Sequence, residues 1–121
     1  MADQGTSGLK RIYNATGYSI AGLVAAYKNE AAFRQELLLV IILAPIAVWL
    51  GEEVIDKVLL ISSLLLILIV ELINSAIEST VDRIGKEQNE LSGRAKDIGS
   101  AAVALSLINA AVIWVLLLII D

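Results

Sequence analysis

Residues Val54–Ile84, VIDKVLLISSLLLILIVELINSAIESTVDRI, decide the fold of this chain. The first part of the stretch is almost wholly apolar, as expected of a membrane-spanning helix. Glu71, Asn74 and Glu78 then appear without interrupting the helical rhythm, and their spacing places them on one face of a helix. A carboxylate within a membrane span is costly and normally faces a protein interior or a wet cavity, so this face is a candidate functional site.

The helix predicted over 54–84 is longer than a membrane is thick. At the rise of an α-helix it measures roughly 46 Å, against about 30 Å for the hydrocarbon core. Its last turns therefore extend into headgroups or water, and Gly85 is expected to end it. Glu71 lies about 10 Å deeper than Glu78 along such a helix. The two carboxylates are therefore predicted to act at different depths.

The composition is that of an integral membrane protein. Of the 121 residues, 58% are hydrophobic and 18% are charged, which fits a single membrane domain over 1–121. Cysteine and histidine are both absent, so disulfides, imidazole-bound zinc and a histidine base are excluded, and acid–base chemistry falls to Asp, Glu, Lys or Tyr. The net charge of −4, without a basic block, leaves no reason to expect a nucleic acid partner.

Two features are predicted at the membrane–water interface. Residues from about 6 to 28 form an apolar stripe at helical spacing, which predicts an amphipathic surface helix. A signal peptide is the competing interpretation, because Lys10 and Arg11 precede a mildly apolar run. Trp49 and Trp114 are expected to act as interface anchors.

Two more spans flank the long helix and complete an all-α membrane protein. The first covers about 29–50, and Pro45 should kink it or break its hydrogen-bond ladder. The last covers about 92–120, with Ser92 as the expected N-cap. Small residues around Gly99 would let neighbouring helices approach closely.

The distribution of basic residues predicts the orientation in the membrane. Basic residues gather before the first span and around the second loop, and only one flanks the first loop. By the positive-inside rule, the N-terminus and the second loop are cytoplasmic and the C-terminus is outside. The residues concerned are Lys10, Arg11, Lys28 and Arg34, then Arg83, Lys86, Arg94 and Lys96, and finally Lys57.

The polar residues predicted to converge at the cytoplasmic side have a consistent chemistry. Glu30 and Glu78 are candidate ligands for Mg²⁺, which takes oxygen donors and completes its shell with phosphates. Glu71, at bilayer depth, suits a general base acting on a hydroxyl presented from the lipid. Lys96 is positioned to meet a polyphosphate. Asn74 would orient a substrate or, alternatively, act only as a hydrogen bond between helices.

Each of these residues also has a simpler structural explanation. Glu30 and Arg34 are four residues apart on a helix and would form a surface ion pair. Asp82 would be a solvated charge near the second loop. Lys96 and Asp97 would only decorate the first turn of a helix.

The pattern alone leaves the class of function open. The phosphate-binding motif G-x-x-x-x-G-K-[ST] is absent, since Gly85 and Lys86 are followed by Glu87. An enzyme, a small transporter that uses Glu71 as a proton carrier, and a non-catalytic assembly subunit all remain compatible with the spacing.

The sequence resembles the bacterial integral-membrane diacylglycerol kinases. The order and spacing of three blocks fit that family, and with the surface helix and three spans the likeness covers nearly the whole chain. The blocks are EAAFRQE at 30–36, ELINSAIE at 71–78 followed by VDR at 81–83, and LSGRAKD at 91–97.

The resemblance implies both an activity and an assembly. Members transfer the γ-phosphoryl group of MgATP to the hydroxyl of diacylglycerol, giving phosphatidic acid. They work in the bacterial inner membrane as homotrimers with composite sites shared between subunits. By position, Glu71 would be the catalytic base supported by Asn74, and Glu30 and Glu78 would hold Mg²⁺. The resemblance further implies that Arg11, Tyr18, Glu87, Gln88, Asn89, Lys96 and Asp97 contact the nucleotide, and that Arg34, Gln35 and Ser100 lie near the lipid.

Two positions depart from the family pattern, and one relative offers an alternative substrate. Members often carry His where this chain has Asn89 and Trp where it has Ile20. Undecaprenol kinase has a similar architecture, although the blocks at 33–36 and 94–97 are more similar to the diacylglycerol kinases.

Overall fold

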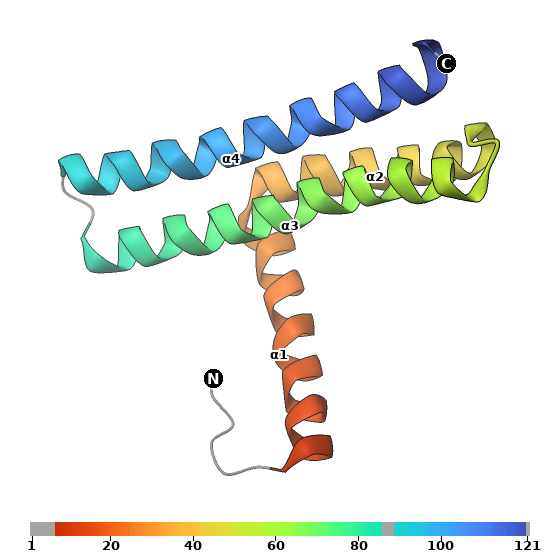
Figure 1. Ribbon diagram of the computed structural model, residues 1–121. Helices are drawn as coiled ribbons and strands as arrows, with labels where there is room; N and C mark the ends of the chain where they lie inside the picture. Colours follow the sequence, from red (N-terminus) through yellow and green to blue (C-terminus); the bar gives the residue numbers. More distant parts are fainter. Residues whose placement is uncertain (1–6, 86–88, 121) are drawn as a thin grey trace.

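The computed structural model describes residues 7–85 and 89–120. The described chain is entirely helical apart from short connections, which confirms the predicted all-α class (Figure 1). Every predicted helix is present, with bounds within about two residues of those expected. The elements are α1 (Gly8–Asn29), α2 (Ala31–Leu50), α3 (Val54–Ile84), α4 (Glu90–Val115) and a final π-helical segment, η1 (Leu116–Ile120).

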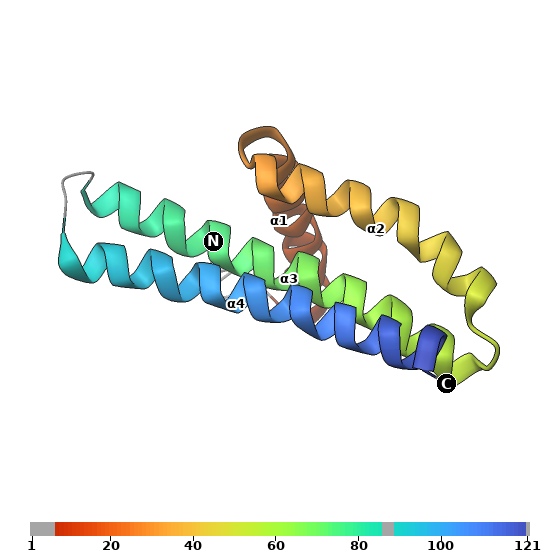
Figure 2. The same cartoon turned by 90° about the horizontal axis from the view of Figure 1, so that it is seen from above.

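Three of these helices are long and apolar enough to cross a membrane, as predicted. They are α2, α3 and the continuous segment formed by α4 and η1. α4 runs alongside α3 in both views, whereas α2 folds back along the first half of α3 (Figures 1 and 2). α1 leaves the start of α2 at a steep angle to all three.

The long helix α3 is the centre of the molecule, because α2 and α4 both pack against it. Its buried positions include Leu60, Leu64 and Ile67, which recur at helical spacing along one stripe. Leu64 and Ile67 form a core with Ala110 of α4, and apolar side chains of α2 pack around it. The stripe continues into the polar part of the helix and so fixes the direction of the polar side chains.

The helix ends follow local capping chemistry. Gly51 and Gly85 end α2 and α3, and the side chains of Glu53 and Asp56 form a capping box at the start of α3. The prediction of Ser92 as N-cap was wrong. Asn89 caps α4 instead, since its Oδ1 accepts bonds from the backbone N–H groups of residues 91 and 92 at 2.9 and 3.2 Å. An asparagine caps a helix as well as a serine, so α4 begins two residues earlier than expected.

Two expectations about individual residues are modified by the structure. Pro45 lies inside α2, which nevertheless runs unbroken from Ala31 to Leu50, so the missing proline N–H costs a local hydrogen bond and not the helix. Trp49 is highly exposed, as an interface anchor would be. Trp114 instead joins two helices, because its indole Nε1 donates a hydrogen bond to Oγ of Ser63 at 3.1 Å.

Candidate functional site

Glu71 and Asn74 form the centre of the candidate site on α3. Only 3% of Glu71 and 7% of Asn74 is exposed, so both polar residues are buried on the stripe that carries the apolar core. Glu71 follows Ile67 by one helical turn and therefore lies directly above the core along α3. This placement agrees with the expectation that a carboxylate at this depth faces the protein interior.

Two side chains meet the Glu71 carboxylate. Ser75, one turn further along α3, donates a hydrogen bond from Oγ to Oε2 of Glu71 at 3.1 Å. Glu36 of α2 brings its own carboxyl group within hydrogen-bonding range of Glu71. Oε2 of Glu36 is buried and meets no N–H or O–H donor in the described part of the chain. Two acidic side chains, from α2 and α3, therefore face each other at this point between the spans.

Glu36 is a site residue that the sequence did not identify as one. It belongs to a matched block, but no role followed from its position at the edge of a span. A weak signal was present, because Glu36, Val40, Leu43 and Ala47 repeat at helical spacing and the last three lie inward in α2. That stripe packs on α3, so it directs Glu36 toward Glu71.

Asn74 packs against the backbone of α4. A Cβ atom placed on Gly99 would overlap the Asn74 side chain, so the absence of a side chain at position 99 is what admits Asn74. This confirms the predicted close helix approach at Gly99. Oδ1 of Asn74 is buried and accepts no hydrogen bond from any described residue. The site therefore contains a buried acceptor that is available to a donor.

Glu30 lies at the junction of α1 and α2, where the backbone is extended. It lines a cavity of about 620 Å³ between α1 and α3, together with mostly small side chains such as Ala26, Ala76 and Ser79. Ser75 lines the same cavity and also bonds to Glu71. The cavity therefore adjoins the buried carboxylate.

Glu78 occupies the face of α3 that carries Glu71 and Asn74, and it is half-buried. One turn further on, Asp82 forms an ion pair with Lys96 of α4, with 2.8 Å between Oδ1 and Nζ. Asp82 was expected to be a solvated charge and Lys96 to decorate a helix turn. Instead, the two side chains are each about half exposed and join α3 to α4.

The two predicted metal ligands come from different elements, the α1–α2 junction and α3. Glu30 lines the cavity at Ala76 and Ser79, whereas Glu78 continues the face of Glu71. In residues 7–85 and 89–120, no group of three or more acidic side chains is placed to hold a metal ion. Carboxylate oxygens nevertheless suit Mg²⁺, which commonly takes one or two of them and fills its shell with water and phosphate. The donors fit a metal that arrives on a polyphosphate.

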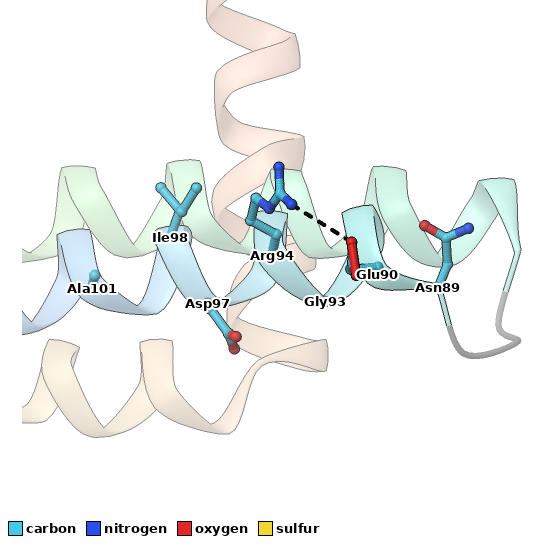
Figure 3. A pocket seen from close by; sticks show the side chains of 7 residues that line it. All are labelled: Asn89, Glu90, Gly93, Arg94, Asp97, Ile98 and Ala101. Atoms are coloured by element: carbon cyan, nitrogen blue, oxygen red, sulfur yellow. Dashed lines mark ion pairs between the residues drawn. The ribbon is translucent and has the colours of Figure 1, made fainter.

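The predicted nucleotide contacts are distributed over two helices. Asn89 and Asp97 line one surface cavity of about 680 Å³ along α4. Figure 3 shows Asp97 projecting from a different side of α4 than Arg94, which is paired with Glu90 at 3.8 Å. Arg11 and Tyr18 are exposed on α1. Glu87 and Gln88 lie outside the described residues.

The residues predicted near the lipid are all exposed in the described structure. Arg34 donates hydrogen bonds to the backbone oxygens of Tyr27 and Lys28 at 2.6 and 3.3 Å, so it caps the end of α1. The alternative ion pair between Arg34 and Glu30 is not formed in the described structure. Gln35 and Ser100 are exposed on α2 and α4.

The fold and this site define a helical membrane protein with a buried carboxylate on its central span, which faces a second acidic side chain on the neighbouring span. The family model of prokaryotic diacylglycerol kinase matches residues 17–118. The chain therefore belongs to the prokaryotic diacylglycerol kinase family.

Several bacterial diacylglycerol kinases match nearly the whole chain. The protein from Escherichia coli K12 is 58% identical over 113 residues, which cover 93% of each chain. The protein from Pseudomonas aeruginosa is 52% identical over 116 residues, covering 96% of this chain and 94% of its own. The protein from Haemophilus influenzae is 52% identical over 109 residues, covering 90% and 92%.

Proposed function

We propose that this protein is a MgATP-dependent diacylglycerol kinase, which transfers the γ-phosphoryl group of ATP to the lipid hydroxyl and releases phosphatidic acid. The observation that carries the proposal is the burial of Glu71 on a membrane-spanning helix, in contact with Ser75 and a second carboxyl group. Family membership supports the substrate class, because relatives that match over more than nine-tenths of their length are diacylglycerol kinases.

Glu71 acts as the general base. Phosphoryl transfer depends mainly on positioning and charge stabilisation, and it requires a group that takes the proton from the attacking hydroxyl. Ser75 holds Oε2 of Glu71, so Oε1 is the oxygen that would take the proton of the incoming hydroxyl. Asn74 offers its buried Oδ1 as an acceptor for a substrate donor. A lipid hydroxyl reaches this depth without leaving the membrane.

The remaining residues bind the two substrates. Glu30 and Glu78 hold Mg²⁺ on the ATP phosphates, and the metal supplies charge neutralisation on the transferred group when bound. Lys96 adds a positive charge beside Glu78 and Asp82. The proposed nucleotide contacts are Arg11, Tyr18, Glu87, Gln88, Asn89, Lys96 and Asp97, and the proposed lipid contacts are Arg34, Gln35 and Ser100.

The protein is further proposed to work as a homotrimer in the bacterial inner membrane. α1 would lie along the cytoplasmic surface, since it runs at a steep angle to the spans (Figure 1). The loop between α3 and α4 would be cytoplasmic and the C-terminus outside. Assembly has a physical motive, because the outer faces of α2 and α4 expose many large apolar side chains and a few thin helices cannot enclose this many polar groups alone.

A phosphate-transfer assay tests the proposal. Labelled ATP is offered with diacylglycerol, undecaprenol or no lipid, with and without Mg²⁺, to the wild type and to Glu71→Gln. We expect Mg²⁺-dependent labelling of diacylglycerol and a loss of about 10²–10⁴-fold in kcat on removal of the base. Glu52→Gln, an exposed acid at the opposite end of the spans, is the matched control.

Three results would count against the assignment. Near-normal turnover of a folded Glu71→Gln protein would remove the proposed base. Faster labelling of undecaprenol than of diacylglycerol would change the lipid acceptor. No labelling of any lipid alcohol by the wild type would reject the kinase assignment, and ion flux in liposomes without ATP consumption would replace it with transport.

A further inference from the structure

An apolar cavity of about 240 Å³ lies among the three spans, below the carboxyl pair. Its walls come from α2, α3 and α4, and they include Leu43, Ile67, Ala111 and Trp114. No charged side chain lines it. The cavity shares no lining residue with the cavities beside Glu30 and along α4.

The cavity continues the line of the catalytic face. Ile67 precedes Glu71 by one turn on the same face of α3, and Leu39 follows Glu36 by one turn on α2. The cavity therefore begins directly below the two facing carboxyl groups. Any apolar chain attached to a hydroxyl at Glu71 meets this space first.

Trp114 closes the far end of the cavity. Its indole is held by the hydrogen bond to Ser63, and Ser63 Oγ donates in turn to the backbone oxygen of Leu60 at 2.7 Å. Ser63 precedes Glu71 by eight residues, which is about 12 Å along the helix. The floor of the cavity is thus fixed relative to the carboxylate.

The cavity is also open to the surroundings of the protein. Leu39, Leu107 and Ala111 line it and are themselves exposed on the surface of the spans. A chain can therefore enter sideways from the lipid without passing the polar site. A nucleotide would find no polar partner here, and the volume is too small for two lipid chains side by side.

We propose that this cavity holds the first part of one acyl chain of the lipid acceptor, and that Trp114 limits how far the chain can enter. The inference rests on the proposed kinase function and adds a specificity site to it. Binding of one chain brings the attached hydroxyl to Glu71, so chain length affects how well the hydroxyl is positioned. Ala111 and Trp114 determine specificity in this scheme, and neither takes part in the chemistry.

Filling the cavity tests the site. Ala111→Phe places a large side chain into the open wall, and Ala102→Phe makes the same change at an exposed position of α4 that does not line the cavity. KM is measured for diacylglycerols of increasing chain length in detergent micelles. We expect Ala111→Phe to raise KM for long-chain lipid about tenfold, the effect of excluding roughly two methylene groups, with KM for ATP unchanged.

Opening the floor gives an independent test. Trp114→Leu lengthens the cavity and should move the preferred chain length upward. Ser63→Ala removes the hydrogen bond that holds the ring of Trp114 but keeps the ring, so the preferred chain length should shift less than in Trp114→Leu. Thermal stability in detergent is measured for each variant, which separates a loss of fold from a change of preference.

The outcomes distinguish the cavity from the proposed function. Wild-type kinase activity with an unchanged chain-length profile in both Ala111→Phe and Trp114→Leu overturns the acyl site and leaves the kinase assignment intact. An equal loss for all chain lengths in Ala111→Phe, together with a smaller oligomer, shows that a second copy of the chain occupies the cavity and also overturns it. Absence of lipid phosphorylation by the wild type rejects the proposed function itself.

Discussion

Glu71 illustrates how a single residue is made tolerable at membrane depth. An acidic side chain at the centre of a membrane helix costs about 2.5–3.5 kcal/mol on insertion scales. Burial against α2, the hydrogen bond from Ser75 and the contact with Glu36 together remove Glu71 from lipid. The hydrogen bond from Ser75 offsets part of that cost. The same contacts that stabilise the residue also orient it.

The hydrogen bond from Ser75 leads to a prediction at this scale. Ser75→Ala removes the hydroxyl that positions one oxygen of Glu71, so we expect kcat to fall about 10-fold or more, since the bond involves a charged acceptor. KM for ATP should change little, because no phosphate contact is assigned to Ser75. Steady-state kinetics with both substrates varied separate the effect on kcat from the effect on KM for ATP.

The control for this change is Ser62→Ala, which truncates an exposed serine on the same helix. Its kinetics should match those of the wild type. A fall in kcat of similar size in both variants would show that truncating any serine of α3 lowers activity. It would contradict a specific role for Ser75.

At the scale of helices, the contact between α3 and α4 sets the geometry of the site. Its polar end is held by the ion pair between Asp82 and Lys96, and its apolar end by the bond between Ser63 and Trp114. Between these two contacts, Gly99 allows the backbone of α4 to touch the Asn74 side chain. The position of Asn74 therefore depends on a glycine in another helix.

Gly99→Ala is predicted to displace Asn74. The added methyl group overlaps a buried side chain, and overpacking of this kind costs about 1–3 kcal/mol. We expect a lower melting temperature in detergent and a loss of kinase activity of at least about tenfold. Gly93→Ala, in the same helix and facing open space, should instead raise the stability by up to about 1 kcal/mol. Equal stability of the two variants would contradict the close contact.

Helix ends could be predicted from the sequence where a single local signal marks them. The bounds of α3 were predicted correctly because the helical pattern begins at Val54 and Gly85 is a local stop signal. The start of α4 was missed because two good capping residues, Asn89 and Ser92, compete within four positions. Burial of Glu71 followed from its apolar neighbours along the helix.

Contacts between helices were the part that the sequence did not predict. Glu36 meets Glu71 across two helices, and Lys96 meets Asp82 in the same way. Neither pair has a spacing along the chain that a helical pattern encodes, because the relative rotation of two helices depends on packing of whole faces. The resemblance assigned roles to Glu71 and Lys96, but it did not assign their partners.

At the scale of the whole molecule, the outer surface indicates assembly. Large apolar side chains such as Ile41, Leu105 and Ile119 are well exposed, which suits contact with lipid or with further copies of the chain. Glu30 lies at the junction of α1 and α2 and Glu78 lies on α3, and no group of three or more acidic side chains is placed to hold a metal within the described residues of one chain. A site shared between neighbouring subunits would bring additional ligands to each metal.

Mixed oligomers test this sharing of sites. Glu30→Gln and Glu78→Gln each remove one proposed metal ligand, so each variant alone should lose most of its activity. If Glu30 of one subunit works with Glu78 of its neighbour, then assembly of the two variants in one oligomer restores some sites in which both carboxylates are present. We therefore expect a minor but clear recovery of phosphate transfer after the variants are unfolded and reassembled together.

The recovered activity must be assigned to mixed oligomers, and not to unmixed oligomers of either variant. Different affinity tags on the two variants allow the mixed species to be purified, and its mass in detergent should correspond to three copies. Activity confined to the doubly tagged species supports shared sites, because variants that are merely present together have no intact pair of ligands. A purified mixed trimer that is no more active than either parent would mean that Glu30 and Glu78 act within one chain, and the metal would then be held between the α1–α2 junction and α3 of a single subunit.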